Sequence, residues 1–396
     1  MTLLSEALAN MAPSATMAMS QKARDMRAQG INVISLAAGE PNFDTPDNIK
    51  NAAIAAIDAG KTGYTAVDGI PELKLAISKS FRRNNRLDYT PSQINVSPGG
   101  KAVIYNALAA TLDPGDEVVI PTPCWVSYPQ MVRLLGGTPV TVPCPANNGY
   151  RLKAEDLAAH ITDKTRWLVL NSPGNPTGTV YERADYAALA DVMTAYPNLM
   201  ILSDEIYEHL DYSGNFISFA QALPQFHDRT LTMNGVSKAY AMTGWRIGYA
   251  GGPEWLVKGM AKVMMQTTSN AGSISQWASV EALDGPQDYL IERRAAFRQR
   301  RDFVVERLVA LEGLRCETPD GAFYAFIPAC EAMKHLGIQS DIQLCDRLLT
   351  EAHVSVVPGS AFHGPDAFRL SYAADIEILE CAMNRMDAFF SRVARP

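Results

Sequence analysis

Four short polar segments contain most of the side chains that could do chemistry in this chain. NSPGNPTG (171–178), SDEIY (203–207) and NGVSK (234–238) each end an apolar run, and SPGGK (97–101) comes at the start of an expected helix. They combine amines, carboxylates, amides and hydroxyls with glycine turns. Taken singly, each segment has an ordinary interpretation as a surface charge, a helix cap or a turn.

Together, these side chains meet the requirements of one cofactor, pyridoxal 5′-phosphate. It needs a lysine for a Schiff base and an acid facing its ring nitrogen. Its phenolic oxygen needs hydrogen-bond donors, and its phosphate needs a helix N-terminus and a cation. The residues that could fill these places are Lys238 and Asp204, then Tyr207 with Asn175, then the helix start at 99–102 with Arg246.

Motifs for other chemistries are absent from the sequence. Gly99-Gly100-Lys101 lacks the spacing of a phosphate-binding P-loop, and no Gly-x-Gly-x-x-Gly marks a dinucleotide site. No Gly-x-Ser-x-Gly marks a serine nucleophile, and no His-Glu-x-x-His marks a zinc site. We therefore expect no metal.

The pattern between residues 95 and 255 predicts how these segments meet. Apolar runs at 116–121, 165–173, 198–205 and 229–237 alternate with helical patterns. Near-continuous apolar strands separated by helices favour an α/β fold with a mostly parallel sheet between helices. Ligands bind beyond the carboxyl ends of such strands, where the polar segments lie.

The C-terminal part has a different pattern. One long helix is expected at 288–311, and its arginine cluster is interrupted by acids, which indicates a solvated helix face. Short strand and helix patterns follow. We expect an N-terminal segment (1–45) packing with a small α+β domain (288–396), and a large cofactor-binding domain (46–287).

Composition narrows the class of protein. The 396 residues carry a formal charge of −7, which argues against a nucleic-acid partner. Six cysteines without a C-x-x-C pair are expected to be free thiols. The N-terminus does not resemble a signal peptide and no apolar stretch is long enough to span a membrane, so we expect a cytoplasmic protein.

Nearly the whole chain resembles the fold type I, class I aminotransferases, close to bacterial aspartate aminotransferases. The resemblance extends from Pro13-Ser14-Ala15-Thr16 to the RLSYA segment at 369–373. The motifs that carry it are AGEPNFDTP (38–46), GYTAVDGIPELK (63–74), PCWVSYP (123–129), NSPGNPTG, SDEIYEHL (203–210), SKAYAMTGWRIGY (237–249) and PGSAF (358–362).

The resemblance implies roles for residues at matching positions. Lys238 would form the Schiff base and carry the proton, with Asp204 at the ring nitrogen and Tyr207 at the phenolic oxygen as further catalytic residues. The cofactor would also be held by residues that contact its ring, phenolic oxygen and phosphate: Gly100, Lys101, Trp125, Asn175, Ser237 and Arg246. Tyr64 would be lent by the neighbouring subunit, which implies a homodimer.

Substrate residues are implied in the same way. Arg369 would clamp the α-carboxylate through a bidentate pair, and Lys101 is associated with the distal carboxylate of aspartate or glutamate. Gly39, Trp125 and Asn175 would also contact the substrate. One departure concerns prephenate: relatives that accept it carry a lysine just before Pro-Ser-Ala-Thr, where this chain has Ala12 before Pro13.

These features predict a ping-pong L-aspartate:2-oxoglutarate aminotransferase that yields oxaloacetate and L-glutamate. Alternatives are an aromatic or broad-specificity aminotransferase, a carbon–sulfur lyase, and a non-catalytic module that senses the cofactor. The small-molecule partners would be an amino acid and a 2-oxo acid. The 37 residues that precede AGEPNFDTP are expected to be too few for the DNA-binding domain of such a sensor.

Overall fold

The computed structural model describes residues 4–9 and 15–391. Its larger part is built on a seven-stranded sheet in the order β2-β8-β7-β6-β5-β3-β4. Pairing is parallel from β7 to β4, whereas β8 is antiparallel to both β7 and β2. The mostly parallel α/β sheet expected from the sequence is therefore confirmed. The strands are β2 (Ile94–Ser97), β3 (Glu117–Thr122), β4 (Thr138–Pro143), β5 (Thr165–Asn171), β6 (Met200–Asp204), β7 (Thr230–Gly235) and β8 (Gly248–Gly251).

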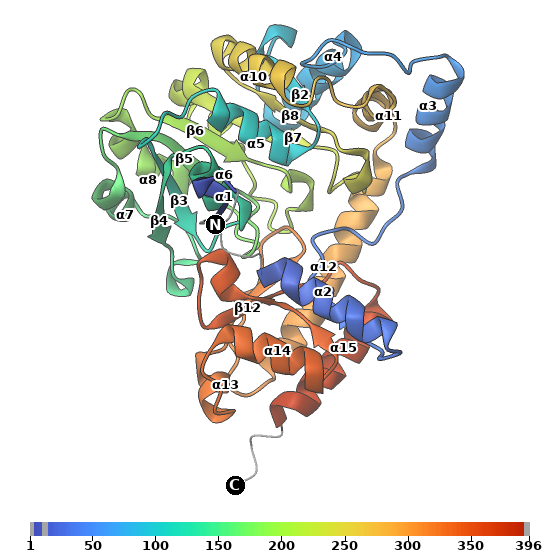
Figure 1. Cartoon of the computed structure of the whole chain (residues 1–396), viewed down its shortest axis with the longest axis vertical. Coiled ribbons are helices and arrows are strands. Elements are labelled where there is room, and N and C mark those ends of the chain that lie inside the picture. Colours follow the sequence, from blue (N-terminus) through green and yellow to red (C-terminus); the bar gives the residue numbers. More distant parts are fainter. Residues whose placement is uncertain (1–3, 10–14, 392–396) are drawn as a thin grey trace.

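Helices cover both faces of this sheet (Figure 1). Alternate residues of β5 point to the two faces of the sheet. Trp167 and Val169 pack on the face covered by α5, α6 and α10. Leu168 and Leu170 pack on the face covered by α7 and α8. A strand buried on both faces needs apolar residues at every position. The helices of this part are α3 (Asp47–Asp58), α4 (Pro71–Ser80), α5 (Gly100–Ala109), α6 (Ser127–Leu134), α7 (Ala154–His160), α8 (Arg183–Thr194), α9 (Phe219–Ala222), α10 (Glu254–Gln266) and α11 (Ser273–Asp284).

The smaller part contains an antiparallel sheet in the order β11-β12-β9. Strand β1, near the N-terminus, pairs in parallel with β10, and Met19 and Val33 belong to the same apolar core as the C-terminal helices. The domain boundaries at 45/46 and 287/288 stay a prediction. The elements are α1 (Glu6–Ala9), α2 (Ala15–Ala28), β1 (Ile34–Ser35), α12 (Asp288–Val309), β9 (Tyr324–Pro328), α13 (Cys330–His335), α14 (Asp341–Glu351), β10 (Val354–Ser355), β11 (Val357–Pro358), β12 (Ala367–Ser371) and α15 (Ile376–Phe390).

Helix α12 corrects one expectation. Its arginines do not all lie on a solvated face, because Arg300 and Arg301 are buried. Arg300 contacts Asn42 and Asp375, and its guanidinium lies over the ring of Phe43. Helical periodicity turns part of the arginine cluster toward the N-terminal segment, so these side chains join α12 to other elements.

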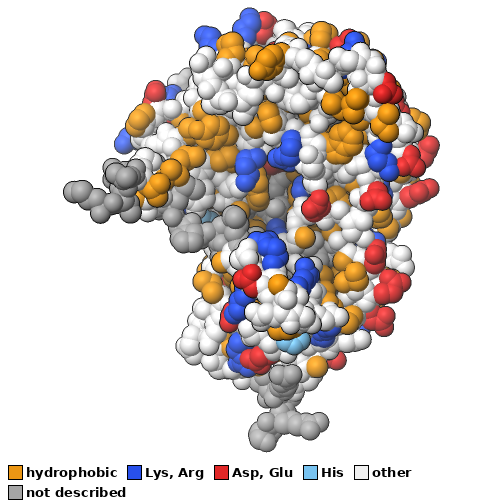
Figure 2. Space-filling model, turned by 45° about the vertical axis from the view of Figure 1, so that its right-hand side comes forward, with side chains coloured by type: hydrophobic (Ala, Val, Ile, Leu, Met, Phe, Trp, Pro, Cys, Tyr) orange, Lys and Arg blue, Asp and Glu red, His pale blue; other side chains and the backbone are white. Residues whose placement is uncertain are grey.

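The surface shows where charge gathers. On the face drawn in Figure 2, several Lys and Arg side chains lie near the junction of the larger and smaller parts, while acidic side chains follow one edge. Within the described ranges, no helix is long and apolar enough to cross a membrane.

Candidate active site

A cavity of about 310 Å³ lies at the carboxyl ends of the central strands and reaches the smaller part of the molecule. Strands β5, β6 and β7 are neighbours, and their register places Asn171 beside Asp204 and Asp204 beside Met233. All three residues line the cavity. So do eleven of the twelve site residues predicted from the sequence: Gly39, Gly100, Lys101, Trp125, Asn175, Asp204, Tyr207, Ser237, Lys238, Arg246 and Arg369.

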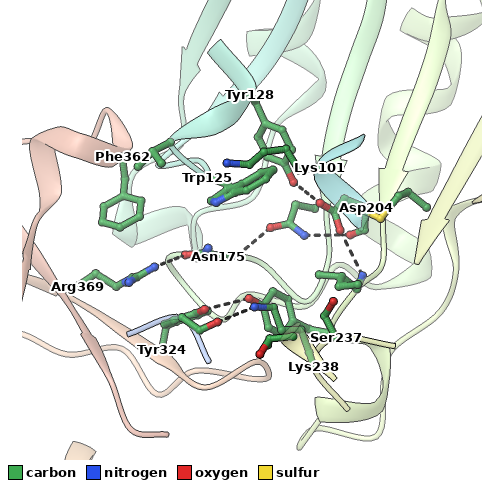
Figure 3. A pocket seen from close by; sticks show the side chains of 18 of the residues that line it. Lys101, Trp125, Tyr128, Asn175, Asp204, Ser237, Lys238, Tyr324, Phe362 and Arg369 are labelled. Atoms are coloured by element: carbon green, nitrogen blue, oxygen red, sulfur yellow. Dashed lines mark hydrogen bonds between the residues drawn. The ribbon is translucent and has the colours of Figure 1, made fainter. Parts of the chain in front are cut away.

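Lys238 lies just after β7 and presents its amine to the cavity (Figure 3). Its Nζ donates a hydrogen bond to the carbonyl oxygen of Gly39 at 2.5 Å. Burial of the amine lowers the pKa of Lys238 to about 8, and the positive charge of Arg369 acts in the same direction. A lysine with this pKa is neutral often enough near physiological pH to act as a nucleophile or a base.

Asp204 ends β6 and is buried. The hydroxyl of Tyr128 donates to its Oδ2 at 2.5 Å, and the backbone N–H of Ile206 donates to its Oδ1 at 3.2 Å. Burial raises the pKa of Asp204 to about 6, and the bond from Tyr128 opposes that rise. The carboxylate is therefore positioned to face a positive group, such as a protonated ring nitrogen.

Arg369, on β12, is buried on the opposite side of the cavity. Its Nη1 donates to Oδ1 of Asn175 at 3.0 Å and its Nη2 to the carbonyl of Ala37 at 2.7 Å. Its Nε is buried and has no hydrogen-bond partner within the described part of the chain. The guanidinium lies over the rings of Tyr324 and Phe362, at 4.4 and 4.8 Å from their centroids. No acidic side chain of the described residues pairs with this cation, so an anionic ligand could bind it.

The start of α5 has features that suit a second anion. Gly99 has a φ of +92°, and a Cβ at this position would lie 2.3 Å from Nη2 of Arg246. Only glycine allows the arginine to approach the helix start this closely. Backbone amides at a helix N-terminus together with a guanidinium suit a phosphate. Ser237 lines the same cavity as Arg246 and adds a hydroxyl.

Lys101 and Trp125 lie together at the cavity wall (Figure 3). The amine of Lys101 is 5.1 Å from the centroid of the Trp125 indole, and no acidic partner is recorded for it among the described residues. Burial lowers the pKa of Lys101, and the charge of Arg246 adds to this effect. Trp125 also packs edge-to-face on Tyr128, with 5.2 Å between ring centroids.

Tyr64 is the predicted site residue that does not line the cavity. Its side chain is 95% exposed in the single chain. Its predicted place in a neighbouring subunit's site stays a prediction. Ala12, Pro13 and Ser14, on which the prephenate argument and part of the N-terminal motif rest, lie outside the described residues.

Sequence reasoning missed several residues of the cavity, chiefly Tyr128, Tyr324 and Phe362. Tyr128 and Phe362 occur within the PCWVSYP and PGSAF motifs, so a signal for them was present. Tyr324 occurs in an apolar strand where nothing local distinguishes it from a core residue. Its position beside Tyr207 depends on how the two parts of the molecule pack.

The set of donors fits pyridoxal phosphate. The cavity is lined by four cations, Lys101, Lys238, Arg246 and Arg369, and by one carboxylate, Asp204. The amine, the carboxylate and the helix start meet the needs of the aldehyde, the ring nitrogen and the phosphate. The space that Gly99 leaves for Arg246 and the unpartnered Nε of Arg369 are both consistent with anions bound here.

Comparison with known proteins also points to an aminotransferase. The model of the family "Aminotransferase class I and II" matches residues 31–385. An aspartate/prephenate aminotransferase of Cereibacter sphaeroides is 52% identical over 98% of this chain and 99% of its own length. An aspartate aminotransferase of Rhizobium meliloti is 50% identical over 94% of this chain and 92% of its own.

Solved structures agree. The crystal structure of the aspartate aminotransferase from Rhizobium meliloti superposes with a TM-score of 0.96 at 48% identity, covering 99% of this chain and 100% of that one. The Thermus thermophilus aspartate aminotransferase with maleate gives 0.92 at 43% identity, covering 98% and 100%. The chain therefore belongs to the aminotransferase class I and II family and is a transaminase that uses pyridoxal phosphate.

Proposed function

We propose that this transaminase is an L-aspartate:2-oxoglutarate aminotransferase that works by a ping-pong cycle. The observation that carries the proposal is the charge of the cavity, where four cations face one carboxylate. A phosphate accounts for Arg246, and a carboxylate pair in the substrate accounts for Arg369 and Lys101. A dicarboxylic amino acid and a dicarboxylic 2-oxo acid match this arrangement. Relatives that are about half identical are named aspartate aminotransferases.

Residue roles follow from the geometry. Pyridoxal phosphate, when bound, supplies the electron sink that makes a proton on the substrate's α-carbon removable. Lys238 would remove and return this proton, because its amine has a pKa of about 8 and lies inside the cavity. Asp204 would hold positive charge at the ring nitrogen, and Tyr207 with Asn175 would donate to the phenolic oxygen.

Arg369 and Lys101 would orient the substrate. The fork of Arg369 pairs with the α-carboxylate through two parallel hydrogen bonds, which fixes direction as well as charge. Lys101 would bind the distal carboxylate. An uncharged side chain would leave this partly buried cation without a partner, so the site should discriminate against it.

A homodimer is also proposed. Tyr64 is almost fully exposed in one chain although its motif resembles a phosphate contact, and a second subunit would explain both facts. The exposed side chains of Ile54 and Ile57 on α3 are close in sequence to Tyr64 and would be covered in the same contact. The cytoplasmic location expected from the sequence stays a prediction.

A half-reaction panel tests the substrate assignment. Each amino acid is mixed with the loaded enzyme, and conversion of the cofactor to its amine form is followed by absorbance. Aspartate and glutamate should react fastest, with 2-oxoglutarate reversing the change. Release of pyruvate and ammonia from a cysteine conjugate without an acceptor would instead indicate a lyase, and cofactor binding without conversion would indicate a sensor.

Two variants sharpen this test. Lys101→Ala should slow aspartate by about 100-fold at limiting concentration, since a charged hydrogen bond contributes about 1.5–3 kcal/mol, and should spare alanine and tyrosine. Lys164→Ala, which removes an exposed lysine outside the cavity, is the control. An unchanged aspartate rate in Lys101→Ala would remove Lys101 from the assignment. Prephenate belongs in the panel of acceptors because one relative is named an aspartate/prephenate aminotransferase.

A further inference from the structure

Tyr324 touches two functional parts of the site. It is fully buried at the start of β9, and its hydroxyl lies 2.9 Å from the hydroxyl of Tyr207 (Figure 3). The face of its ring carries the guanidinium of Arg369, 4.4 Å from the ring centroid. One side chain therefore contacts both the proposed phenolic-oxygen donor and the proposed carboxylate clamp.

The direction of the hydroxyl pair follows from proton counting. Each tyrosine has one O–H to donate. If Tyr207 donates to the cofactor's phenolic oxygen, as proposed above, its oxygen must accept from Tyr324. Among the hydrogen bonds of the described residues, the hydroxyl of Tyr324 has no other partner. A donor that itself accepts a hydrogen bond is polarised and donates more strongly.

Gly39 leaves room for the hydroxyl of Tyr324. A Cβ at Gly39 would lie 3.0 Å from this hydroxyl, so a side chain there would crowd it. The carbonyl of Gly39 also accepts the bond from Lys238. The hydroxyl of Tyr324 thus packs against the backbone segment that the lysine contacts.

The ring of Tyr324 has a separate effect on Arg369. Within the described part of the chain this buried guanidinium has no acidic partner, and it lies over the rings of Tyr324 and Phe362. Aromatic faces attract a cation and restrict the plane of the fork. An arginine held in one plane is ready for a bidentate carboxylate.

We propose that Tyr324 is a positioning residue with two functions: its hydroxyl donates to Tyr207 and strengthens that residue's bond to the cofactor, and its ring holds Arg369 ready for the substrate carboxylate. The first function rests on the proposed role of Tyr207. The second depends only on Arg369 binding a carboxylate.

The hydroxyl is tested by the absorbance of the loaded enzyme against pH without substrate, which reports the pKa of the nitrogen joining Lys238 to the cofactor. A donor at the phenolic oxygen stabilises its negative charge most when this nitrogen is deprotonated, so it lowers that pKa. Tyr324→Phe should raise the midpoint by about 0.5 to 1 in pH, the effect of one neutral hydrogen bond. Tyr207→Phe should raise it further.

A double variant and a control variant distinguish an effect of Tyr324 through Tyr207 from the general effect of losing a buried hydroxyl. Tyr207→Phe with Tyr324→Phe should match Tyr207→Phe alone, because Tyr324 acts through Tyr207. Tyr372→Phe removes a buried hydroxyl outside the cavity and should leave the midpoint unchanged. If Tyr207→Phe does not move the midpoint, the proposed role of Tyr207 is wrong. If Tyr207→Phe moves the midpoint and Tyr324→Phe does not, the inference about the hydroxyl is overturned while the proposed function stands.

The ring is tested by binding of maleate, a dicarboxylate that has no amino group to transfer. Tyr324→Phe keeps the aromatic face, so its Kd should stay within twofold of the parent. Tyr324→Leu removes that face and should weaken maleate by about tenfold. The thermal unfolding of both variants is compared to confirm that they fold. Equal Kd values for the Phe and Leu variants would overturn the inference about the ring.

Discussion

The hydroxyl of Tyr128 lies 2.5 Å from Oδ2 of Asp204, and both side chains are buried. Among the described residues, no arginine or lysine lies within ion-pair distance of Asp204. Its oxygens instead accept hydrogen bonds from the hydroxyl of Tyr128 and the backbone N–H of Ile206. Burial alone favours the protonated acid, and the bond from Tyr128 favours the carboxylate. Tyr128 therefore helps to keep Asp204 charged.

Tyr128→Phe should make Asp204 harder to ionise. Its pKa, about 6 in the parent protein, should rise. Protonation of an acid grows as the pH falls through its pKa, so the loss of activity at acid pH should begin at a higher pH in the variant. The half-reaction rate at pH 7 should fall about tenfold, as expected for one charged hydrogen bond. The measurement is the single-turnover rate against pH.

A matched control for that experiment is Tyr181→Phe, because Tyr181 is a buried tyrosine in the same part of the molecule that does not line the cavity. Its pH profile should overlay that of the parent. If the acid limb moves equally in both variants, the effect comes from general loosening and not from the bond to Asp204.

Asp204→Ala tests the carboxylate directly. Without a negative charge at this position, the ring nitrogen loses the partner that favours its protonated form. The variant should still take up cofactor, because Lys238 and the α5 start remain, but it should lose most of its half-reaction rate. Absorbance after reduction with borohydride measures uptake, and a stopped-flow trace measures the rate. A variant that keeps the parent's rate would contradict the role given to Asp204.

The sequence indicated the site well where chemistry and strand ends coincide. Asp204 ends β6 and Lys238 follows β7, and parallel pairing of these strands brings such residues to the same edge of the sheet. Strand β8 could not be recognised in the same way. Its sequence is Gly-Tyr-Ala-Gly, and glycine is a residue that disfavours strands. A Cβ at Gly248 would lie 2.3 Å from the backbone nitrogen of Gly100, so the close packing of β8 against the start of α5 requires glycine there.

The contacts of Tyr324 and Arg300 depend on tertiary packing instead. Tyr324 looks like a core residue of β9, and its hydroxyl meets that of Tyr207, which comes from the larger part of the molecule. Arg300 looks like part of a charged helix face, and its burial depends on the N-terminal segment that lies against α12. The local sequence does not show which distant element meets either side chain.

Loading of the apoprotein should depend on pH through Lys238. Only the neutral amine attacks the cofactor's aldehyde, and the neutral fraction grows as the pH rises through the pKa of about 8. The rate of cofactor uptake should therefore rise between pH 7 and 9 and level off above. An ordinary exposed lysine would keep accelerating toward pH 10. Uptake is followed by absorbance at fixed cofactor concentration, and a rate that is still rising steeply above pH 9 would contradict the lowered pKa.

Subunit mixing tests the proposed dimer. Lys238→Ala and Tyr64→Ala homodimers should both be impaired, the first completely. When equal amounts are unfolded and refolded together, half of the dimers should contain one chain of each kind. Each such dimer has one site with both Lys238 and the partner's Tyr64 intact, so about a quarter of all sites should recover. Activity no higher than the mean of the two parents would exclude a shared site.

Gly99 offers a test of the phosphate site because the chain contains a second positive-φ glycine, Gly30, with open space around it. Gly99 and Gly30 have φ angles of +92° and +84°, but a Cβ at Gly99 would lie 2.3 Å from Arg246, whereas a Cβ at Gly30 meets nothing within 4 Å. Alanine is strained at either position because φ is positive, and the ψ of 158° at Gly99 lies in a region that essentially only glycine adopts, so thermal unfolding is used first to confirm that both variants fold. Only Gly99→Ala must push Arg246 away from the start of α5. Its Kd for cofactor should rise at least tenfold while Gly30→Ala binds like the parent, as measured by titrating the apoproteins. Equal affinities in the two variants would mean that the close approach of Arg246 to Gly99 does not serve the phosphate.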